Sequence, residues 1–189
     1  MKKTLTNYEK IIGPVAISKL RQVARDLKGA SVVHVNSTRE GGGVAEILFW
    51  MIPMMKELGL DAKWEVIEGN AEYFNTTKTF HNGLQGNDVI LTDRMIRVYE
   101  DTVADNAERL RPILQDADFV VIHDPQPAFL HELCPEKRGQ WIWRCHIDAS
   151  RPNRAVWNYL RSKVNNFDAS IFSMPDYAHK LDQLGRAHF

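Results

Sequence analysis

The 189-residue chain is long enough for one domain with a substantial core, or for one lobe of a larger enzyme. Lysine plus arginine and aspartate plus glutamate each total 24, which excludes an overall charge that would attract nucleic acid or an anionic membrane. The two cysteines, Cys134 and Cys145, lack the spacing of a metal site or a disulfide framework, so we expect neither.

The amino-terminal segment predicts no targeting signal. Met1 leads into no apolar h-region, and no run in the sequence approaches the roughly 18 apolar residues that a membrane span requires. We therefore expect a cytoplasmic protein without a membrane partner. The first predicted helix opens at Pro14 and runs to about Leu27, where Gly29 can stop it.

A strand, three consecutive glycines and a helix follow. Residues 31–36 predict a buried strand, residues 41–43 are all glycine, and residues 45–58 predict an apolar helix. Glycines let a ligand approach the backbone, and a helix start offers unpaired N–H groups and a positive dipole end. The spacing is neither Gly-x-Gly-x-x-Gly nor that of a P-loop, which argues against a dinucleotide dehydrogenase and a P-loop NTPase. We interpret the glycines as a ligand loop, the alternative being a simple turn.

The remaining sequence alternates between predicted strands and helices, as βαβ units do. Strands are predicted at residues 63–67, 119–122, 141–143 and 169–172, and helices at residues 95–114 and 154–163. The polar segment 69–93 is left without a predicted element. The pattern predicts an α/β fold, a Rossmann-like open parallel sheet with helices on both faces.

Three of the predicted strands end in polar residues. Asn36 leads into the glycines, and the other two strands run into His123-Asp-Pro-Gln126 and Arg144-Cys-His-Ile-Asp148. The carboxyl ends of parallel strands lie at one edge of a sheet, where ligands bind. A single histidine there is more often structural than catalytic, but the convergence of carboxylates, amides and histidines suits a ligand with many hydroxyl groups. No serine or cysteine nucleophile motif accompanies them.

Five ordered motifs within residues 5–174 resemble the amino-terminal lobe of the trehalose glycosyltransferring synthases. These are retaining enzymes of the glycosyltransferase family 4 type, with the two-lobed GT-B fold, and are related to trehalose phosphorylase. The motifs are residues 41–46, 64–67, 80–86, 123–127 and 143–148. The resemblance implies a hexosyltransferase that moves glucose from a nucleoside-diphosphate glucose to glucose, giving α,α-trehalose reversibly and with retention.

The resemblance also implies roles for particular residues. His146 would be the catalytic residue beside the transferred glucose, and the backbone of Gly42 and Gly43 would face the donor diphosphate or sugar. On a helix turn, His81 and Gln85 would share one face. The residues expected to bind the acceptor sugar are His81, Asn82, Gln85, Asp124, Gln126, Asp148 and Arg151.

The expected partners are small molecules. They are glucose, trehalose and the nucleoside-diphosphate glucose as co-substrate, with no tightly bound cofactor and no metal site. The divalent-metal dependence and the preferred base stay open. The five tryptophans and the apolar helix suit either a core or a homodimer interface, so the oligomeric state stays open as well.

The domain boundaries follow from the resemblance. We expect residues 1–174 to form an acceptor lobe and residues 175–189 to be a non-matching tail, truncated or artificial, with the donor lobe absent and the chain inactive alone. A non-catalytic sugar-binding module is the main alternative. A Rossmann oxidoreductase is a further one, since Glu65 and Glu68 lie near the end of the second strand, and a spectral change on adding NADH would distinguish it.

Overall fold

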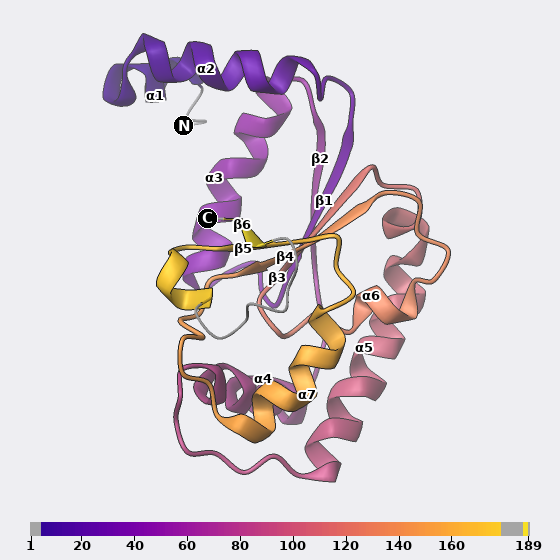
Figure 1. The fold of residues 1–189 in the computed structure, drawn as a ribbon. Helices are drawn as coiled ribbons and strands as arrows, with labels where there is room; N and C mark the ends of the chain where they lie inside the picture. Colours follow the sequence, from indigo (N-terminus) through magenta and orange to yellow (C-terminus); the bar gives the residue numbers. More distant parts are fainter. Residues whose placement is uncertain (1–4, 179–186, 189) are drawn as a thin grey trace.

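The computed structural model describes residues 5–178 and 187–188 (Figure 1). All strand pairs in the described sheet are parallel, and the strand order is β2-β1-β3-β4-β5-β6. The strands are β1 (Ser31–Asn36), β2 (Asp61–Val66), β3 (Phe119–His123), β4 (Gln140–Cys145), β5 (Ala169–Phe172) and β6 (Ala187–His188). The helices are α1 (Leu5–Ile12), α2 (Pro14–Arg25), α3 (Gly43–Glu57), α4 (Ala71–Leu84), α5 (Asp93–Leu114), α6 (Leu130–Leu133), α7 (Arg154–Val164) and the 3-10 helix η1 (Pro175–Ala178).

The expected Rossmann-like sheet is therefore confirmed, with helices on both faces. Figure 1 shows α3 on one side of the strands and α5 and α6 on the other. The order β2-β1-β3 places the reversal of strand order between β1 and β3, which is where ligands bind in doubly wound folds. The register sets Val35 beside Ile122 and His123 beside Arg144, so β1, β3 and β4 end at the same level.

The larger core fills the face of the sheet beneath α4, α5, α6 and α7. Alternate residues of a strand point to opposite faces. Val33 and Val35 of β1 point to this face, where they join Trp141 and Trp143 of β4 and the buried sides of the four helices. Val32, the residue before Val33, is buried on the opposite face, and burial on both faces explains the near-continuous apolar strands.

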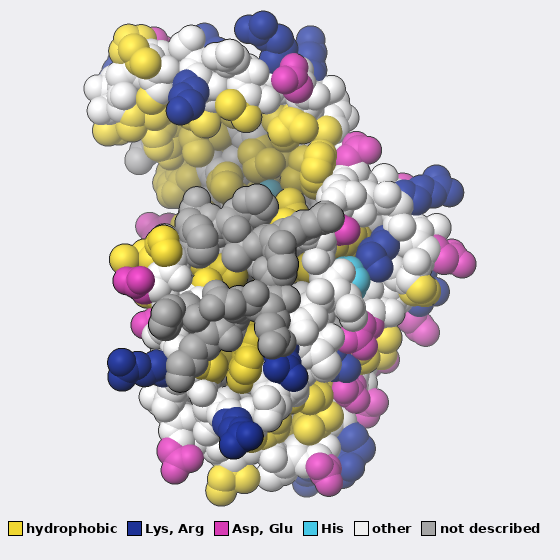
Figure 2. Space-filling model, viewed as in Figure 1, with side chains coloured by type: hydrophobic (Ala, Val, Ile, Leu, Met, Phe, Trp, Pro, Cys, Tyr) yellow, Lys and Arg dark blue, Asp and Glu magenta, His cyan; other side chains and the backbone are white. Residues whose placement is uncertain are grey.

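The opposite face carries less apolar packing. Val32 lies in a small cluster with Ala24 of α2 and Leu60, and a second small cluster joins Leu48 and Ile52 of α3 to β2. Around α1 and α2, hydrophobic side chains gather on the surface, as Figure 2 shows at the top of the molecule. The most exposed of them are Ile11, Val15 and Val23.

One segment differs from its prediction. Within residues 69–93, α4 forms a fourteen-residue helix, because Asn70 accepts a hydrogen bond from the backbone N–H of Tyr73 at 2.9 Å and so caps it. The buried side of α4 includes Tyr73, Thr76 and Phe80, at helical spacing. The sequence does not predict this buried side of the helix, because Thr76 and Thr77 are polar residues that are nevertheless buried.

Other differences are small. α1 and α6 were not predicted, and β2 begins two residues earlier than expected. No helix in the described part of the chain is long and apolar enough to cross a membrane. Of the predicted tail, Pro175–Ala178 forms η1 and Ala187–His188 forms β6, while residues 179–186 and 189 lie outside the described residues.

Candidate functional site

The loop after β3 is held in one conformation. We call residues 124–129 the β3 loop. Its first residue, Asp124, has φ of 61°, and it is the one non-glycine residue in the described chain with positive φ. A left-handed conformation costs a non-glycine residue roughly 1–2 kcal/mol, so the surrounding contacts must maintain it. Such strain is found disproportionately at functional sites.

Three aromatic side chains supply those contacts. Trp143 Nε1 donates to the carbonyl of Asp124 at 3.0 Å, Tyr99 Oη donates to that of Pro125 at 2.9 Å, and Tyr73 Oη donates to that of Gln126 at 2.9 Å. Three consecutive carbonyls are thus each paired with a side chain from the core. The β3 loop is therefore fixed from beneath by β4, α5 and α4.

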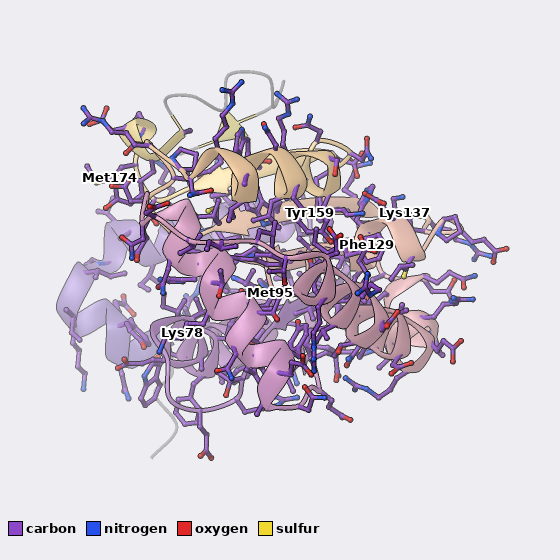
Figure 3. All side chains as sticks on the ribbon, turned by 90° about the horizontal axis from the view of Figure 1, so that it is seen from below. Lys78, Met95, Phe129, Lys137, Tyr159 and Met174 are labelled. Carbon is purple, nitrogen blue, oxygen red and sulfur yellow. The ribbon has the colours of Figure 1, made fainter. Side chains whose placement is uncertain are left out.

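The far end of the loop is held by the same tyrosine. Tyr99 Oη accepts a hydrogen bond from the backbone N–H of Phe129 at 3.1 Å. The Tyr99 ring also packs near those of Phe129 and Tyr159, which are labelled in Figure 3. Lys163 lies over the Phe129 ring at 4.0 Å and within 3.4 Å of the Glu132 carboxylate.

The Asp124 side chain acts on the next strand. Its Oδ1 accepts a hydrogen bond from the backbone N–H of His146 at 2.7 Å. Burial raises the pKa of this carboxyl to about 6, although the hydrogen bond and the charge of Arg144 act in the opposite direction. Two predicted site residues, Asp124 and His146, are therefore in direct contact.

A chain of three histidines runs from the middle of β1, through the end of β3, to the residue after β4. His34 Nδ1 lies 3.0 Å from His123 Nε2, and His123 Nδ1 lies 2.9 Å from His146 Nε2. Adjacent rings are stacked, with centroids 5.3 Å and 5.2 Å apart. We call these residues the histidine chain. His34 and His123 are buried, whereas His146 is half-buried.

Burial keeps the histidine chain neutral at pH 7. It lowers the pKa of His34 and of His146 to about 4. For His123, burial and then the neighbouring charges of His34, His146 and Arg144 lower the pKa to about 2. Neutral imidazoles donate with one nitrogen and accept with the other, so the chain is directional.

The end of α4 lies next to the segment that follows β4. Gly86, with φ of 92°, closes α4: its N–H donates to the carbonyl of Gly83, and the N–H of Asn87 donates to that of Asn82, both at 3.0 Å. A Cβ at position 86 would lie 2.7 Å from the carbonyl oxygen of Arg151. The backbones of two predicted acceptor segments are thus in contact.

The predicted side chains at this end are more accessible. His81 and Asn82 are half-buried and Gln85 is exposed, at the C-cap position of α4. Burial lowers the pKa of His81. Asp148 is also exposed, and a hydrogen bond from the backbone N–H of Ser150 to its carboxylate lowers its pKa.

The loop after β1 contrasts with the β3 loop. We call residues 37–43 the glycine loop. Gly42 occupies the N-cap position of α3 and no side chain caps that helix. A Cβ at Gly43 would have no heavy atom of the described chain within 4 Å, and one at Gly42 would only touch Thr38. The packing around these two glycines therefore does not require their lack of a side chain.

Contacts of the glycine loop lie mostly within itself and with β2. Asn36 Nδ2 donates to the carbonyl of Thr38 at 2.8 Å, and Trp64 Nε1 donates to Asn36 Oδ1 at 2.8 Å. The Arg39 guanidinium donates to the carbonyl of Trp64 and lies over its ring. Topology places this loop at the same edge of the sheet as the β3 loop.

The geometry brings some of the predicted residues together and leaves others apart. It joins Asp124 to His146, and the end of α4 to the segment around Arg151, whereas no contact within the described residues links Gly42 or Gly43 to His146. Gln126 is held through its backbone, and its side-chain Oε1 is buried without a partner among the described residues. Sequence reasoning missed His34, Tyr73 and Tyr99, because each lies within an otherwise ordinary strand or helix.

The histidines and cysteines of the described chain do not cluster as metal ligands. No group of three or more histidine, cysteine, aspartate or glutamate residues in the described chain could hold a metal ion, since the three rings of the histidine chain follow one another instead of converging. Cys134 and Cys145 are both free and buried, and burial raises the pKa of each thiol.

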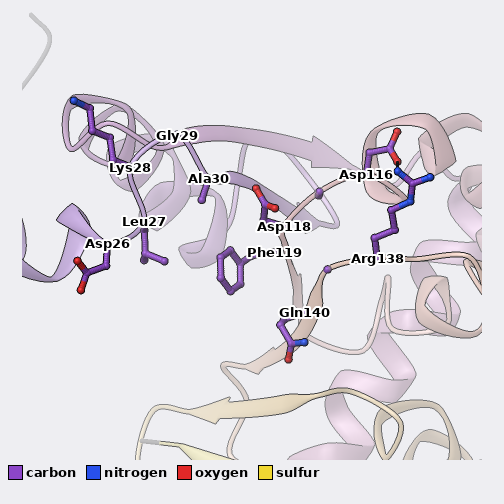
Figure 4. Close-up of a pocket in the computed structure, with 12 residues that line it drawn as sticks. Asp26, Leu27, Lys28, Gly29, Ala30, Asp116, Asp118, Phe119, Arg138 and Gln140 are labelled. Atoms are coloured by element: carbon purple, nitrogen blue, oxygen red, sulfur yellow. Dashed lines mark ion pairs between the residues drawn. The ribbon is translucent and has the colours of Figure 1, made fainter.

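A pocket lies at the opposite edge of the sheet, where the strands begin. This pocket of about 720 Å³ is lined by residues that precede β1, β3 and β4, among them Lys28, Asp116 and Arg138 (Figure 4). Arg138 and Asp116 form an exposed ion pair at 3.3 Å. Ligands of open α/β sheets bind at the carboxyl edge, so we assign the site to the opposite edge from this pocket.

Comparison with known proteins gives consistent matches. The family described as "Trehalose synthase, N-terminal domain" matches residues 34–179. The chain is 49% identical over 184 residues to a trehalose synthase of Pyrococcus horikoshii, covering 96% of this chain and 44% of that protein. It is 50% identical over 179 residues to a trehalose synthase of Thermococcus litoralis, and the match covers 94% of this chain and 43% of that protein.

A more distant match is to a trehalose phosphorylase of Pleurotus pulmonarius. It is 28% identical over 187 residues, covering 88% of this chain and 25% of that protein. The chain therefore spans less than half the length of each of these three relatives. The matched residues 34–179 include both loops, the histidine chain and the end of α4.

Proposed function

Because the chain belongs to the family of trehalose synthase amino-terminal domains, we propose that it is the sugar-positioning part of a trehalose-forming hexosyltransferase. The reaction transfers glucose from a nucleoside-diphosphate glucose to free glucose with retention, and it is reversible. The observation that carries this proposal is that the matched region contains the carboxyl ends of β1 to β5, including the strained Asp124 and its bond to His146.

In this proposal the carboxyl edge positions two sugars. His146 lies beside the transferred glucose, and Asp124 holds its backbone in place from the β3 loop. His81, Asn82 and Gln85 at the end of α4, with Gln126, Asp148 and Arg151, bind the acceptor. Holding two reactants in a reactive geometry can lower a barrier by several kcal/mol, which is the main contribution we assign to these residues.

The glycine loop supplies the donor contact. The uncapped start of α3 leaves backbone N–H groups available, and Gly42 and Gly43 leave room for a phosphate or sugar next to the backbone. Hydrogen bonds from these N–H groups would stabilise negative charge on the diphosphate as it leaves. The nucleoside-diphosphate glucose is a co-substrate here, and the proposal includes no tightly bound cofactor and no metal ligand among these residues. The proposed setting is the cytoplasm, where nucleotide sugars are available.

Asp124 is not the nucleophile in this proposal. Its carboxylate is buried and one of its oxygens is engaged with the His146 N–H. We assign Asp124 a positioning role and leave the bond-making step to the assembled enzyme.

A hybrid enzyme tests the proposal. This chain would replace the matching part of the Thermococcus litoralis trehalose synthase, and trehalose formation would be measured with nucleoside-diphosphate glucose and glucose. We expect turnover by the hybrid, loss of turnover with His146→Ala, and no turnover by the 189-residue chain alone. A folded hybrid that binds both sugars but whose turnover is unaffected by His146→Ala would contradict the proposal; sugar binding by the chain without any transfer in the hybrid would favour a binding module.

A further inference from the structure

The histidine chain has two different ends. At one end, His34 Nε2 is buried and has no hydrogen-bond partner among the described residues. At the other end, His146 is half-buried, and its Nδ1 forms no hydrogen bond with the described part of the chain. Between them, each ring-to-ring contact joins one nitrogen to one nitrogen, at 3.0 Å and 2.9 Å.

Each of these contacts requires one proton. Since all three rings are neutral at pH 7, each ring carries a single N–H. Two arrangements satisfy both contacts. In one, every ring is protonated on Nδ1, so that His34 donates to His123 and His123 donates to His146. In the other, every ring is protonated on Nε2 and the direction is reversed.

The buried end decides between the two arrangements. Protonation on Nε2 would leave the N–H of His34 in the interior without an acceptor, and orphaned buried donors are rarer in proteins than under-satisfied acceptors. Protonation on Nδ1 leaves only a lone pair unpaired there. This favours the arrangement in which His146 carries its proton on Nδ1.

We propose that His123, supported by His34, is a positioning residue that donates to Nε2 of His146 and thereby fixes His146 as a hydrogen-bond donor through Nδ1. A ring held in this way offers an N–H to an oxygen of a bound sugar and cannot accept from a hydroxyl. The identity of that oxygen rests on the proposed function, whereas the tautomer does not.

The hydrogen bond between His123 and His146 also fixes the orientation of the His146 ring. His146 follows the last residue of β4 and is only half-buried, so without a partner on Nε2 its ring is free to turn toward water. His123 is buried and lies at the end of β3, which makes it a rigid support. This is the same arrangement by which a second group orients a functional histidine elsewhere in proteins.

Nuclear magnetic resonance of the 189-residue chain tests the proposal directly. With 15N-labelled histidine at pH 7.5, long-range 1H–15N correlations report which nitrogen of each ring is protonated. We expect Nδ1–H at His34, His123 and His146. Protonation of His146 on Nε2, or a mixture of its tautomers, would overturn the proposal.

Three variants test whether His123 is the cause. His123→Phe removes both nitrogens, so His146 is expected to show mixed tautomers. His123→Asn keeps an amide near the position of Nδ1 and is expected to hold His146 in one tautomer. His131→Phe is the matched control, because His131 is also buried but lies outside the histidine chain, between Trp141 and Phe167.

Each outcome of these variants is informative. An unchanged His146 spectrum in His123→Phe would overturn the proposal, as would the same mixture in His123→Asn. If His123→Phe does not fold, the unmodified chain and His123→Asn still decide the case. In the hybrid enzyme, His123→Phe should lower kcat/KM by about three- to tenfold, the effect of one neutral hydrogen bond, with His131→Phe unchanged. A correct tautomer in a chain that binds no sugar would count against the proposed function alone.

Discussion

The β3 loop and the glycine loop lie at the same edge of the sheet but are held in opposite ways. Three consecutive carbonyls of the β3 loop accept hydrogen bonds from buried aromatic side chains, and its first residue is kept at positive φ. The glycine loop leads into a helix without a side-chain cap, and its last glycine faces open space. One loop is organised before any ligand arrives, and the other leaves room for one.

The difference separates stability from function. Residues that hold the β3 loop contribute to the core, so changes there should cost stability first. The glycine loop and the exposed Gln85 at the end of α4 contribute little to the core, so changes there should affect ligands while leaving the fold intact. Four experiments test this contrast, ordered by their expected effect on folding.

Tyr99→Ala should have the largest effect. Tyr99 is fully buried and packs against Phe80, and truncating a buried aromatic side chain costs about 3–5 kcal/mol of unfolding free energy. Tyr99→Phe removes only the hydroxyl group and its two hydrogen bonds, so it should cost about 1–3 kcal/mol. Urea unfolding measures both. Equal losses in the two variants would show that the hydrogen bonds to the β3 loop, and not the ring, dominate.

The histidine chain should make stability depend on pH. Unfolded histidines bind protons below about pH 6.5, whereas folded His34 stays neutral to about pH 4, so stability is lost as the pH falls through this window. His34→Phe should therefore reduce the loss between pH 7 and pH 5 by about 2 kcal/mol. The raised pKa of Asp124 acts in the opposite direction between about pH 6 and its unfolded value, but it is common to both proteins. Urea unfolding measures the stability of the unmodified chain and of His34→Phe at each pH. The same dependence of unfolding free energy on pH in the two would show that His34 is not neutral in the folded chain.

Gly43→Val should leave the fold almost unchanged. The new side chain would meet no heavy atom of the described chain within 4 Å, so the unfolding free energy should change by no more than about 0.5 kcal/mol. Activity of the hybrid enzyme should fall at least about tenfold, because the side chain would occupy the space we assign to the donor. Gly41→Ala is the contrasting variant, since φ of 75° strains any residue with a Cβ. If Gly43→Val lost activity and stability in proportion, Gly43 would have a structural role and not a ligand-binding one.

Gln85→Ala should have the smallest effect on folding. Gln85 is exposed at the end of α4, where Gly86 closes the helix through backbone hydrogen bonds alone. In the hybrid enzyme the KM for glucose should rise by roughly two- to tenfold, the value of one neutral hydrogen bond, with the KM for the nucleotide sugar nearly unchanged. Steady-state kinetics with each substrate varied in turn measure both constants. An unchanged KM for glucose would remove Gln85 from the acceptor site.

Much of the fold could be predicted because its signals are local. Residues 31–36 contain three valines and end in Asn36, and residues 119–123 are an apolar run that ends in His123; each pattern indicates both a buried strand and its carboxyl end. α4 escaped prediction because its buried stripe includes two threonines, whose burial only tertiary packing reveals.

The candidate site was predictable in part for the same reason. Asp124 and His146 follow strand ends, so topology alone brings them to one edge. His34 lies within a strand and Tyr99 within a helix, and neither position suggests a role until its neighbours in space are known. The left-handed conformation of Asp124 likewise depends on contacts from three other elements.

The most direct test of the account is where a sugar binds on the 189-residue chain. Glucose and trehalose would be titrated into 15N-labelled protein, with glycerol as the control for a non-specific polyol, while backbone amide shifts are recorded. We expect the shifts caused by the two sugars to cluster in residues 81–86, 124–126 and 146–151, and we expect glycerol to cause none of them. Shifts centred on residues 26–30 and 138–140, at the opposite edge of the sheet, would contradict the account.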